Sequence, residues 1–421
     1  MKEDTKRRKK ASMLFKEIGG RSWWAERFSE IITEGKQGLD RLSLELGRMV
    51  AEAVMYMERE ELAGPDYRPY SSKIRKWASQ PGSVFIGDRK MKVEHPRLRG
   101  PSGEMVLKSY EKLKDPSGFS EQLLDQVLRG LAGRRYSETL VQASKAFGVS
   151  ASSVSRHIVQ ATAKKLKEFR ERSLKDFEPF AIFLDTIHRG GEAFLVGLGI
   201  DLEGTKRVLG FWQGATENHE IGRELLSELE GRGLVISRRV IFVTDGGKGV
   251  IKALRERVGS GLIHQRCTIH KDRNIQRHLA KRWRKEAHRR FRTALEQNSY
   301  ADAKKMLEEF KKWLQGLNES AAQSLEEALE EILTLHRLKV PALLAKTLHS
   351  TNPIESIFAT VRECEGHIKR YRGSGMSQRW LGTVLFHAEQ GFRTIKGNQE
   401  IPAVIAAIEV EQAEKRNAKA A

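Results

Sequence analysis

The sequence predicts an α/β protein whose mixed sheet has the element order βββαβαβ and is followed by a long helical segment. Two apolar runs, residues 180–187 and 239–244, each carry an acid at their ends, Asp185 and Asp245. Glycines follow Asp245 at once and a helix-like stretch comes next, which is typical of a buried parallel strand, a tight turn and a helix. The third observation is that residues 275–347 are almost purely helical and highly charged.

The N-terminal part of the chain predicts helices, then a hairpin. Residues 1–65 carry apolar side chains at helical spacing from Ile31 to Val54, as expected of an amphipathic core helix or a dimer helix. Residues 66–103 contain a predicted hairpin that turns at Gly87–Asp88. His95–Gly100 then predicts a basic extended arm, which could lie along DNA or serve as a plain linker.

Residues 104–177 predict a helix-turn-helix. One helix ends near Phe147, Gly148 suits the left-handed turn, and Ser150 caps a second helix. The outer face of the second helix carries short hydroxyl side chains and an arginine, namely Ser152, Ser153, Ser155 and Arg156. Such side chains suit contacts with base edges and phosphates. An ordinary helical hairpin is the alternative.

Residues 178–274 predict the first part of the core. Short turns join the strands over 180–187, 192–201 and 206–213 into an antiparallel meander. A helix over 221–229, the strand ending at Asp245, a helix over 249–257 and a short strand over 262–265 follow.

The two strand-end acids predict a metal site if their strands are parallel neighbours. Strands lie ~4.8 Å apart, and two carboxylates at that spacing can share metal ions ~3.5–4 Å apart. The alternative is a pair of acids that only solvate strand ends.

A third acid follows the helical insertion of residues 275–347. Within residues 348–397, Thr351 or Asn352 can cap a helix with Pro353 and Glu355 in its first turn. Glu355 is either a routine helix-start glutamate or the third carboxylate of a two-metal site, with Glu363 and Glu365 as fallback candidates. Residues 398–421 are predicted to be a C-terminal tail.

Charge and composition favour a polyanionic partner. Among 421 residues, 75 Lys and Arg outnumber 55 Asp and Glu, which gives a net charge of +20. Nucleic acid is the first candidate for such an excess. Two cysteines, Cys267 and Cys364, exclude a disulfide framework. No apolar run approaches the ~18 residues of a membrane span, and the charged first ten residues predict no secretory signal, so we expect a cytoplasmic protein.

Several ordered stretches resemble the mutator-type transposases of bacterial insertion sequences. The stretches that carry the resemblance are Phe183–Asp185, Val243–Gly249, Gln265–Asn274 and Ser350–Ser356. The pieces Phe211–Asn218, Arg232–Leu234 and Gly148–Arg156 also fit. Together they cover roughly residues 80 to 395, whereas Thr186–Gly191 departs from the pattern usual in the family.

The resemblance implies an RNase H-like catalytic core interrupted by a helical insertion, with Asp185, Asp245 and Glu355 as an Asp-Asp-Glu triad. These acids would hold two Mg²⁺ ions, for which Mn²⁺ can substitute, and would catalyse cleavage and strand transfer at terminal inverted repeats. Cys267 and His270 match a Cys-x-x-His signature of the family, and two ligands do not make a zinc site. We expect this pair to be structural or to organise DNA near the active site.

The expected partner is double-stranded DNA, both element ends and target, bound by a homodimer or higher oligomer on the nucleoid. The predicted DNA contacts are Arg97, Arg99, Ser150, Ser152, Ser153, Ser155, Arg156, Lys248, Arg266, Lys271 and Arg273. The alternatives are a sequence-specific DNA-binding protein without catalysis and an RNase H-like nuclease without strand transfer.

Overall fold

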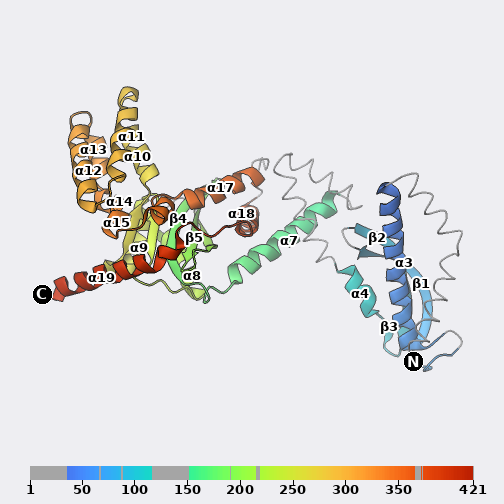
Figure 1. Ribbon diagram of the computed structural model, residues 1–421. Helices are drawn as coiled ribbons and strands as arrows, with labels where there is room; N and C mark the ends of the chain where they lie inside the picture. The colour runs from blue at the N-terminus through green and yellow to red at the C-terminus, as the bar shows by residue number, and fades with distance from the viewer. Residues whose placement is uncertain are drawn as a thin grey trace. The chain divides into compact units, whose positions relative to one another are not determined.

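The computed structural model describes residues 36–65, 68–86, 89–115, 151–189, 191–214, 219–365, 371 and 373–420 (Figure 1). The described residues form two compact units: those up to Ile158 belong to the first, and those from Val159 onward belong to the second. The predicted helix-turn-helix lies mostly outside the described residues, because only its second helix is described, within α7 (Ala151–Glu171). It therefore stays a prediction.

The first unit is a small sheet covered by a helix. Its elements are α3 (Lys36–Ala63), β1 (Arg75–Ile86), β2 (Arg89–Gly100), β3 (Gly103–Met105) and α4 (Lys108–Lys114). The strands lie in the order β1-β2-β3 and are antiparallel. Met55 of α3 and Val84, Val93 and Leu98 of the sheet share one apolar core. The hairpin was predicted correctly, since Ile86 faces Arg89 across it.

The basic arm predicted over residues 95–100 is wrong. These residues continue β2, where Arg99 faces both Arg75 of β1 and Glu104 of β3. His95, Pro96 and Leu98 are buried, Arg97 is half-buried and Arg99 is exposed, so this stretch packs onto the core of the first unit instead of leaving it as an arm. The burial does not follow a strict alternation here, and the basic residues hid the strand in the sequence.

The second unit is built on a five-stranded mixed sheet in the order β6-β5-β4-β7-β8. The strands are β4 (Pro179–Arg189), β5 (Glu192–Asp201), β6 (Lys206–Gly214), β7 (Ile241–Thr244) and β8 (Ile263–Arg266). β4, β5 and β6 form the predicted antiparallel meander. β7 pairs in parallel with β4 on one side and with β8 on the other. The first and fourth strands of the sheet are therefore parallel neighbours, which is the condition on which the predicted metal site depends.

Helices cover the strongly apolar strands. α8 (His219–Gly231) and α9 (Lys248–Val258) connect β6 to β7 and β7 to β8, the latter through a short 3₁₀ turn at Gly259–Gly261. Leu225 of α8 and Leu254 of α9 pack in one core with Ile182 and Phe242 of the sheet. Phe211 of β6 stacks on Phe169 of α7 with their ring centroids 5.9 Å apart.

Residues 275–347 are helical, as predicted, and the first helix of this segment begins earlier than predicted, at Thr268. Its helices are α10 (Thr268–Arg277), α11 (Lys281–Leu295), α12 (Tyr300–Gln315), α13 (Glu319–Glu326), α14 (Leu329–Ile332), α15 (Thr334–Arg337) and α16 (Ala342–Leu348). They enclose an apolar core of their own, which includes Phe291, Leu307 and Phe310. Trp283 and Trp313 pack against this core, as predicted, and their two rings meet edge to face.

The chain returns to the core in α17 (Asn352–Glu365) and α18 (Ser374–Glu389), then ends in a 3₁₀ turn (Asn398–Glu400) and α19 (Ile401–Ala420). The predicted C-terminal tail is therefore wrong. Ile401, Val404 and Ile408 recur at helical spacing and are buried, so this stretch docks as an amphipathic helix. Within the ranges that the structure describes, no helix has the length and apolar character of a membrane span.

Candidate active site

Asp185 and Asp245 lie side by side where β7 ends. Asp185 itself stands within β4, paired with Val196 of β5, and not at the strand end that the sequence predicted, because β4 continues to Arg189. The parallel register pairs Leu184 of β4 with Thr244 of β7, so the acid that follows each of them is the next position along neighbouring strands. Asp185 is only 7% exposed, and its Oδ1 accepts a hydrogen bond from the Thr186 amide at 2.8 Å. The parallel pairing thus brings two carboxylates from distant parts of the sequence together, which is the arrangement that the predicted metal site requires.

The turn after β7 fixes the Asp245 carboxylate. Its Oδ1 accepts a hydrogen bond from the Gly247 amide at 3.0 Å, and the Gly246 amide donates to Thr244 Oγ1 at 3.2 Å. Gly246 has a φ of +104°, a conformation that glycine adopts without steric cost. α9 begins at Lys248 directly behind this turn.

Glu355 stands in the first turn of α17, which begins at Asn352 as expected for a helix with Pro353 near its start. The Thr351 carbonyl accepts the amides of Ile354 and Glu355 at 3.0 and 2.9 Å. Thr351 Oγ1 also lies 3.2 Å from Glu355 Oε1, to which it donates. Of the fallback candidates, Glu363 is exposed and the side chain of Glu365 lies outside the described residues.

Electrostatics ties the three acids together. Burial, followed by the negative charge of Asp245, raises the pKa of Asp185 to about 7, and Glu355 contributes in the same direction. Like charges that approach within a few ångströms oppose each other's ionisation. The three predicted acids therefore act on one another electrostatically, although they come from β4, the β7–α9 turn and α17.

The Cys-x-x-His pair contacts Thr351 and Glu355. Cys267 is fully buried, and its Sγ accepts from the Thr351 amide at 3.4 Å. His270 Nδ1 lies 3.3 Å from Thr351 Oγ1, and its Nε2 lies 3.6 Å from Glu355 Oε1. Contact with Cys267 and the charges of Asp185 and Glu355 raise the pKa of His270 to about 9 despite its burial. The imidazolium is thus a cation beside the acids.

The negative charge of the three acids suits a metal ion, but their arrangement in the structure is not that of a metal site. Within the described part of the chain, no three or more His, Cys, Asp and Glu side chains are arranged to hold a metal ion. The donor chemistry nevertheless suits Mg²⁺, which prefers carboxylate oxygens. A divalent cation would also relieve the repulsion that raises the pKa of Asp185. The carboxylates present therefore fit such an ion in their chemistry and charge.

Two predicted DNA contacts are enclosed within the fold, which corrects the prediction for them. Arg266 is 7% exposed and bonds to Glu331, while Lys271 is 1% exposed and donates to Glu327 Oε1 at 2.6 Å. Sequence alone does not distinguish a basic residue that is ion-paired inside the fold from one that contacts a phosphate. Their partners, Glu327 and Glu331, come from the helical insertion.

The other predicted DNA contacts differ in their availability. Lys248, Arg273, Arg99 and Arg156 are exposed. Arg97 is paired with Glu104 in the first unit, and Ser155 is half-buried on α7. The side chains of Ser152 and Ser153, and all of Ser150, lie outside the described residues.

Sequence reasoning missed two residues of the site. Thr351 was identified only as a helix cap, yet its backbone and hydroxyl contact Cys267, His270 and Glu355. Glu331, which holds Arg266, lies in a four-residue helix of the insertion and carries no local signal.

Fold and site together define a mixed α/β protein with a carboxylate cluster beside the end of β7 and a helical insertion after the last strand. The comparison with protein families identifies the family within this structural class. The family described as Transposase, Mutator family, matches residues 25–394, so the chain belongs to the Mutator family of transposases and the resemblance is confirmed.

Individual relatives carry names of the same kind. The transposase for insertion sequence element IS905 of Lactococcus lactis is 26% identical over 303 residues, which cover 70% of this chain and 71% of the relative. The transposase for IS6120 of Mycolicibacterium smegmatis is 28% identical over 251 residues, covering 58% and 76%. A probable transposase for an ISRM3-like element of Sinorhizobium fredii is 23% identical over 366 residues, covering 85% and 89%.

Proposed function

We propose that this protein is a DNA transposase with an RNase H-like core, in which Asp185, Asp245 and Glu355 form the catalytic triad. It would bind the terminal inverted repeats of an insertion sequence, cleave DNA there and join the freed end to target DNA. The observation that carries the proposal is the convergence of the three acids, expressed in the pKa of Asp185, which burial and the charges of Asp245 and Glu355 raise to about 7.

Asp185, Asp245 and Glu355 would hold two Mg²⁺ ions. When bound, such ions lower the pKa of water or of a 3′-hydroxyl and stabilise the leaving oxygen of a phosphoryl transfer. Carboxylates, water and phosphate oxygens are the ligands that Mg²⁺ prefers.

The protein's own contribution is to orient these carboxylates. The Gly247 amide fixes one oxygen of Asp245, and Thr351 Oγ1 fixes one oxygen of Glu355. The cationic His270 offsets part of the negative charge of the cluster before DNA arrives. Holding groups in their reactive geometry in advance is the main protein contribution to phosphoryl transfer.

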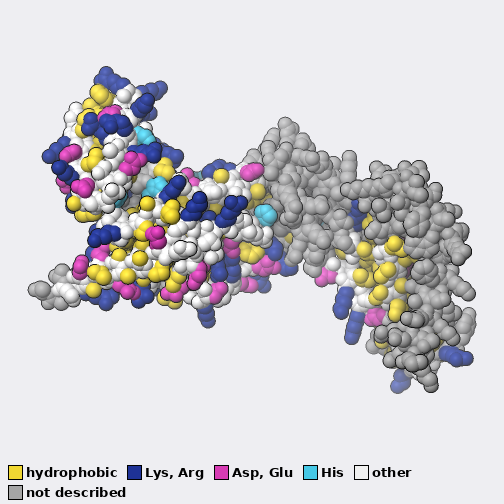
Figure 2. All heavy atoms as spheres, in the orientation of Figure 1, with side chains coloured by type: hydrophobic (Ala, Val, Ile, Leu, Met, Phe, Trp, Pro, Cys, Tyr) yellow, Lys and Arg dark blue, Asp and Glu magenta, His cyan; other side chains and the backbone are white. Residues whose placement is uncertain are grey.

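Basic surface supports a DNA substrate. Seven of the 15 residues of α11 are Lys or Arg, and dark blue Lys and Arg side chains crowd the insertion in Figure 2. Lys248 is exposed at the start of α9, beside the Asp245 turn. We infer that these groups neutralise phosphates, and that the predicted helix-turn-helix, with Arg156 on its second helix, selects the element end. Pairing two ends calls for at least a dimer.

The test is cleavage of a labelled duplex that carries the end of the element encoding this protein, with Mg²⁺ or with EDTA. The proposal expects metal-dependent nicking that leaves a 3′-hydroxyl, followed by joining to a second duplex. Cleavage without joining would favour a nuclease. Tight binding with no cleavage in Mg²⁺ or Mn²⁺ would favour a DNA-binding protein without catalysis.

A further inference from the structure

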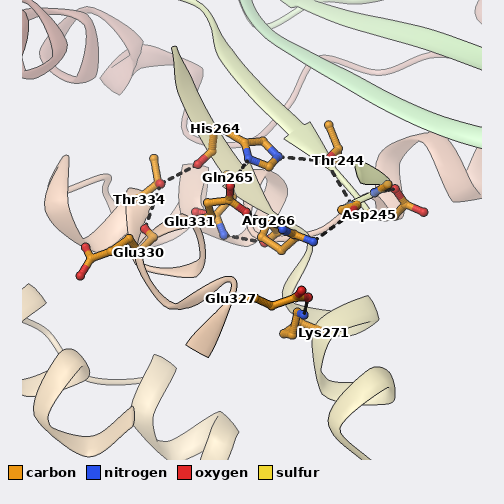
Figure 3. A network of polar contacts seen from close by, with 12 residues as sticks. Thr244, Asp245, His264, Gln265, Arg266, Lys271, Glu327, Glu330, Glu331 and Thr334 are labelled. Atoms are coloured by element: carbon orange, nitrogen blue, oxygen red, sulfur yellow. Dashed lines mark hydrogen bonds and ion pairs between the residues drawn. The ribbon is translucent and has the colours of Figure 1, made fainter. Parts of the chain in front are cut away.

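The turn that carries Asp245 is held by a polar network whose far end lies in the helical insertion (Figure 3). At the centre of this network is the ion pair of Arg266, the last residue of β8, with Glu331 of α14. The two residues are 65 positions apart in the chain. The network therefore links the insertion to the turn next to a predicted catalytic acid.

Glu331 is linked to Gly246 by a route of hydrogen bonds through one carboxylate oxygen, and a second, looser route passes close to the other oxygen. On the first route, Arg266 Nε donates to Glu331 Oε2 at 2.8 Å, and Arg266 Nη1 donates to the Gly246 carbonyl at 3.0 Å. On the second route, His264 Nδ1 lies 3.3 Å from Glu331 Oε1, and His264 Nε2 lies 2.9 Å from Thr244 Oγ1. Thr244 Oγ1 in turn accepts the Gly246 amide.

The Gly246 carbonyl is thus bonded to Arg266, which is itself bonded to Glu331. The Gly246 amide is bonded to Thr244, whose hydroxyl meets His264 beside Glu331, although His264 Nδ1 makes no hydrogen bond to that carboxylate. The packing at this point is tight: a Cβ at Gly246 would lie 1.8 Å from Arg266 Nη1. The Arg266 guanidinium therefore occupies the space beside the turn, and the turn has no room to move toward β8.

The network is enclosed and anchored. The side chains of Arg266 and Glu331 are 9% and 16% exposed. Thr334 Oγ1 donates to the His264 carbonyl at 2.7 Å, which fixes the start of α15 to β8 next to α14. Charge-assisted hydrogen bonds of this kind are stronger than neutral ones, and a planar guanidinium can serve two acceptors at once.

We propose that Arg266 and Glu331 are positioning residues through which the helical insertion fixes the Asp245 turn for catalysis. The inference rests on the proposed function, since it assigns a role to the insertion in that same reaction. It also explains why a basic residue of the motif before Cys267 points inward rather than at DNA. A 1 Å misplacement of a reacting group can cost ~100-fold in rate, so a device that fixes this turn has a direct catalytic consequence.

The first experiment follows the turn itself, without DNA. Amide hydrogen exchange over residues 244–250 is measured by mass spectrometry in the full chain, for Glu331→Gln, Arg266→Lys and Thr244→Val. Glu331→Gln weakens both routes, Arg266→Lys removes the fork that reaches Gly246, and Thr244→Val cuts the second route. We expect exchange of these amides to rise about tenfold or more in Glu331→Gln, and less in Thr244→Val.

A neighbouring ion pair supplies the matched control. Glu327 also joins the insertion to the core, through Lys271 Nζ at 2.6 Å, but neither residue bonds to the Asp245 turn in the described structure. Glu327→Gln should leave exchange over 244–250 at the wild-type rate. Exchange over α12 reports folding of the insertion and should be unchanged in every variant.

The second readout is cleavage of the element-end duplex. Glu331→Gln and Arg266→Lys should cleave about 10- to 100-fold more slowly with unchanged affinity for the duplex, while Glu327→Gln should match the wild type. Unchanged exchange over 244–250 in Glu331→Gln and Arg266→Lys, or an equal effect of Glu327→Gln, would overturn the inference. Failure of the wild-type protein to cleave the duplex would instead contradict the proposed function. The exchange result would still show whether Arg266 and Glu331 fix the Asp245 turn.

Discussion

Replacing Glu331 by glutamine tests the electrostatics of the site most simply. Burial alone would raise the pKa of Glu331, but the neighbouring His264 ring and Arg266 guanidinium outweigh it and lower the pKa to about 2 from 4.5. Arg255 of α9 adds a third partner, with Nη2 3.1 Å from Glu331 Oε1. The glutamine variant keeps the shape of the side chain and removes its charge.

The size of the effect follows from linkage. A difference of about 2.5 between the two pKa values corresponds to about 3 kcal/mol of folding free energy at neutral pH. Solvent screens part of this, since Glu331 is not fully enclosed and Arg255 is exposed, which leaves about 1–2 kcal/mol. Because the folded pKa is depressed, this stability is present above pH ~4.5 and is lost as the pH falls toward 2.

The assay is urea denaturation of both proteins, read by pulsed hydrogen exchange in the peptide that carries β8. The difference in unfolding free energy should be constant from pH 7 to about pH 5 and shrink to less than half near pH 3. Glu309→Gln makes the same chemical change on the exposed face of α12 and should cost less than about 0.5 kcal/mol. A difference that does not vary with pH would refute the assignment of a paired charge to Glu331.

Two further substitutions test the local geometry. Gly246→Ala should destabilise the protein by about 2 kcal/mol or more in thermal unfolding, because the φ of +104° and the Arg266 guanidinium both exclude a side chain. Gly191→Ala is its control, with a φ of +84° and no atom within 4 Å of the added carbon, and an equal loss in both variants would show that packing against Arg266 plays no part. Thr351→Val should slow cleavage about tenfold while Thr351→Ser keeps most of the rate, because the hydroxyl is the Thr351 group that contacts the side chains of Glu355 and His270. Equal rates for valine and serine would remove the Thr351 hydroxyl from the site.

Much of the sheet could be predicted from local pattern. β5 runs from Glu192 to Asp201, the predicted bounds, because turn residues border an almost continuous apolar run. The parallel pairing of β4 with β7 was a condition of the predicted site, and it fits the helix that precedes the buried strand β7. From that pairing follows the meeting of Asp185 and Asp245.

What the sequence did not reveal depends on long-range contacts. Arg266 and Lys271 resemble phosphate contacts until their partners in the insertion are known, and nothing local marks Glu331 or Glu327 as those partners. The α19 helix is a different case, because Ile401, Val404 and Ile408 carried a readable helical spacing. The predicted helix-turn-helix was not tested, because most of it lies outside the described residues.

The central claim is that Asp185, Asp245 and Glu355 act as one catalytic unit, and a set of cleavage rates tests it most directly. Asp185→Asn, Asp245→Asn and Glu355→Gln are compared singly and in pairs on the element-end duplex, with duplex affinity measured for each. We expect each single variant to lose about 1,000-fold or more in cleavage rate with binding retained, and the pairs to lose little more, because residues that act as a unit are not additive. Cleavage by Glu355→Gln at the wild-type rate, or losses that multiply in the pairs, would contradict the claim.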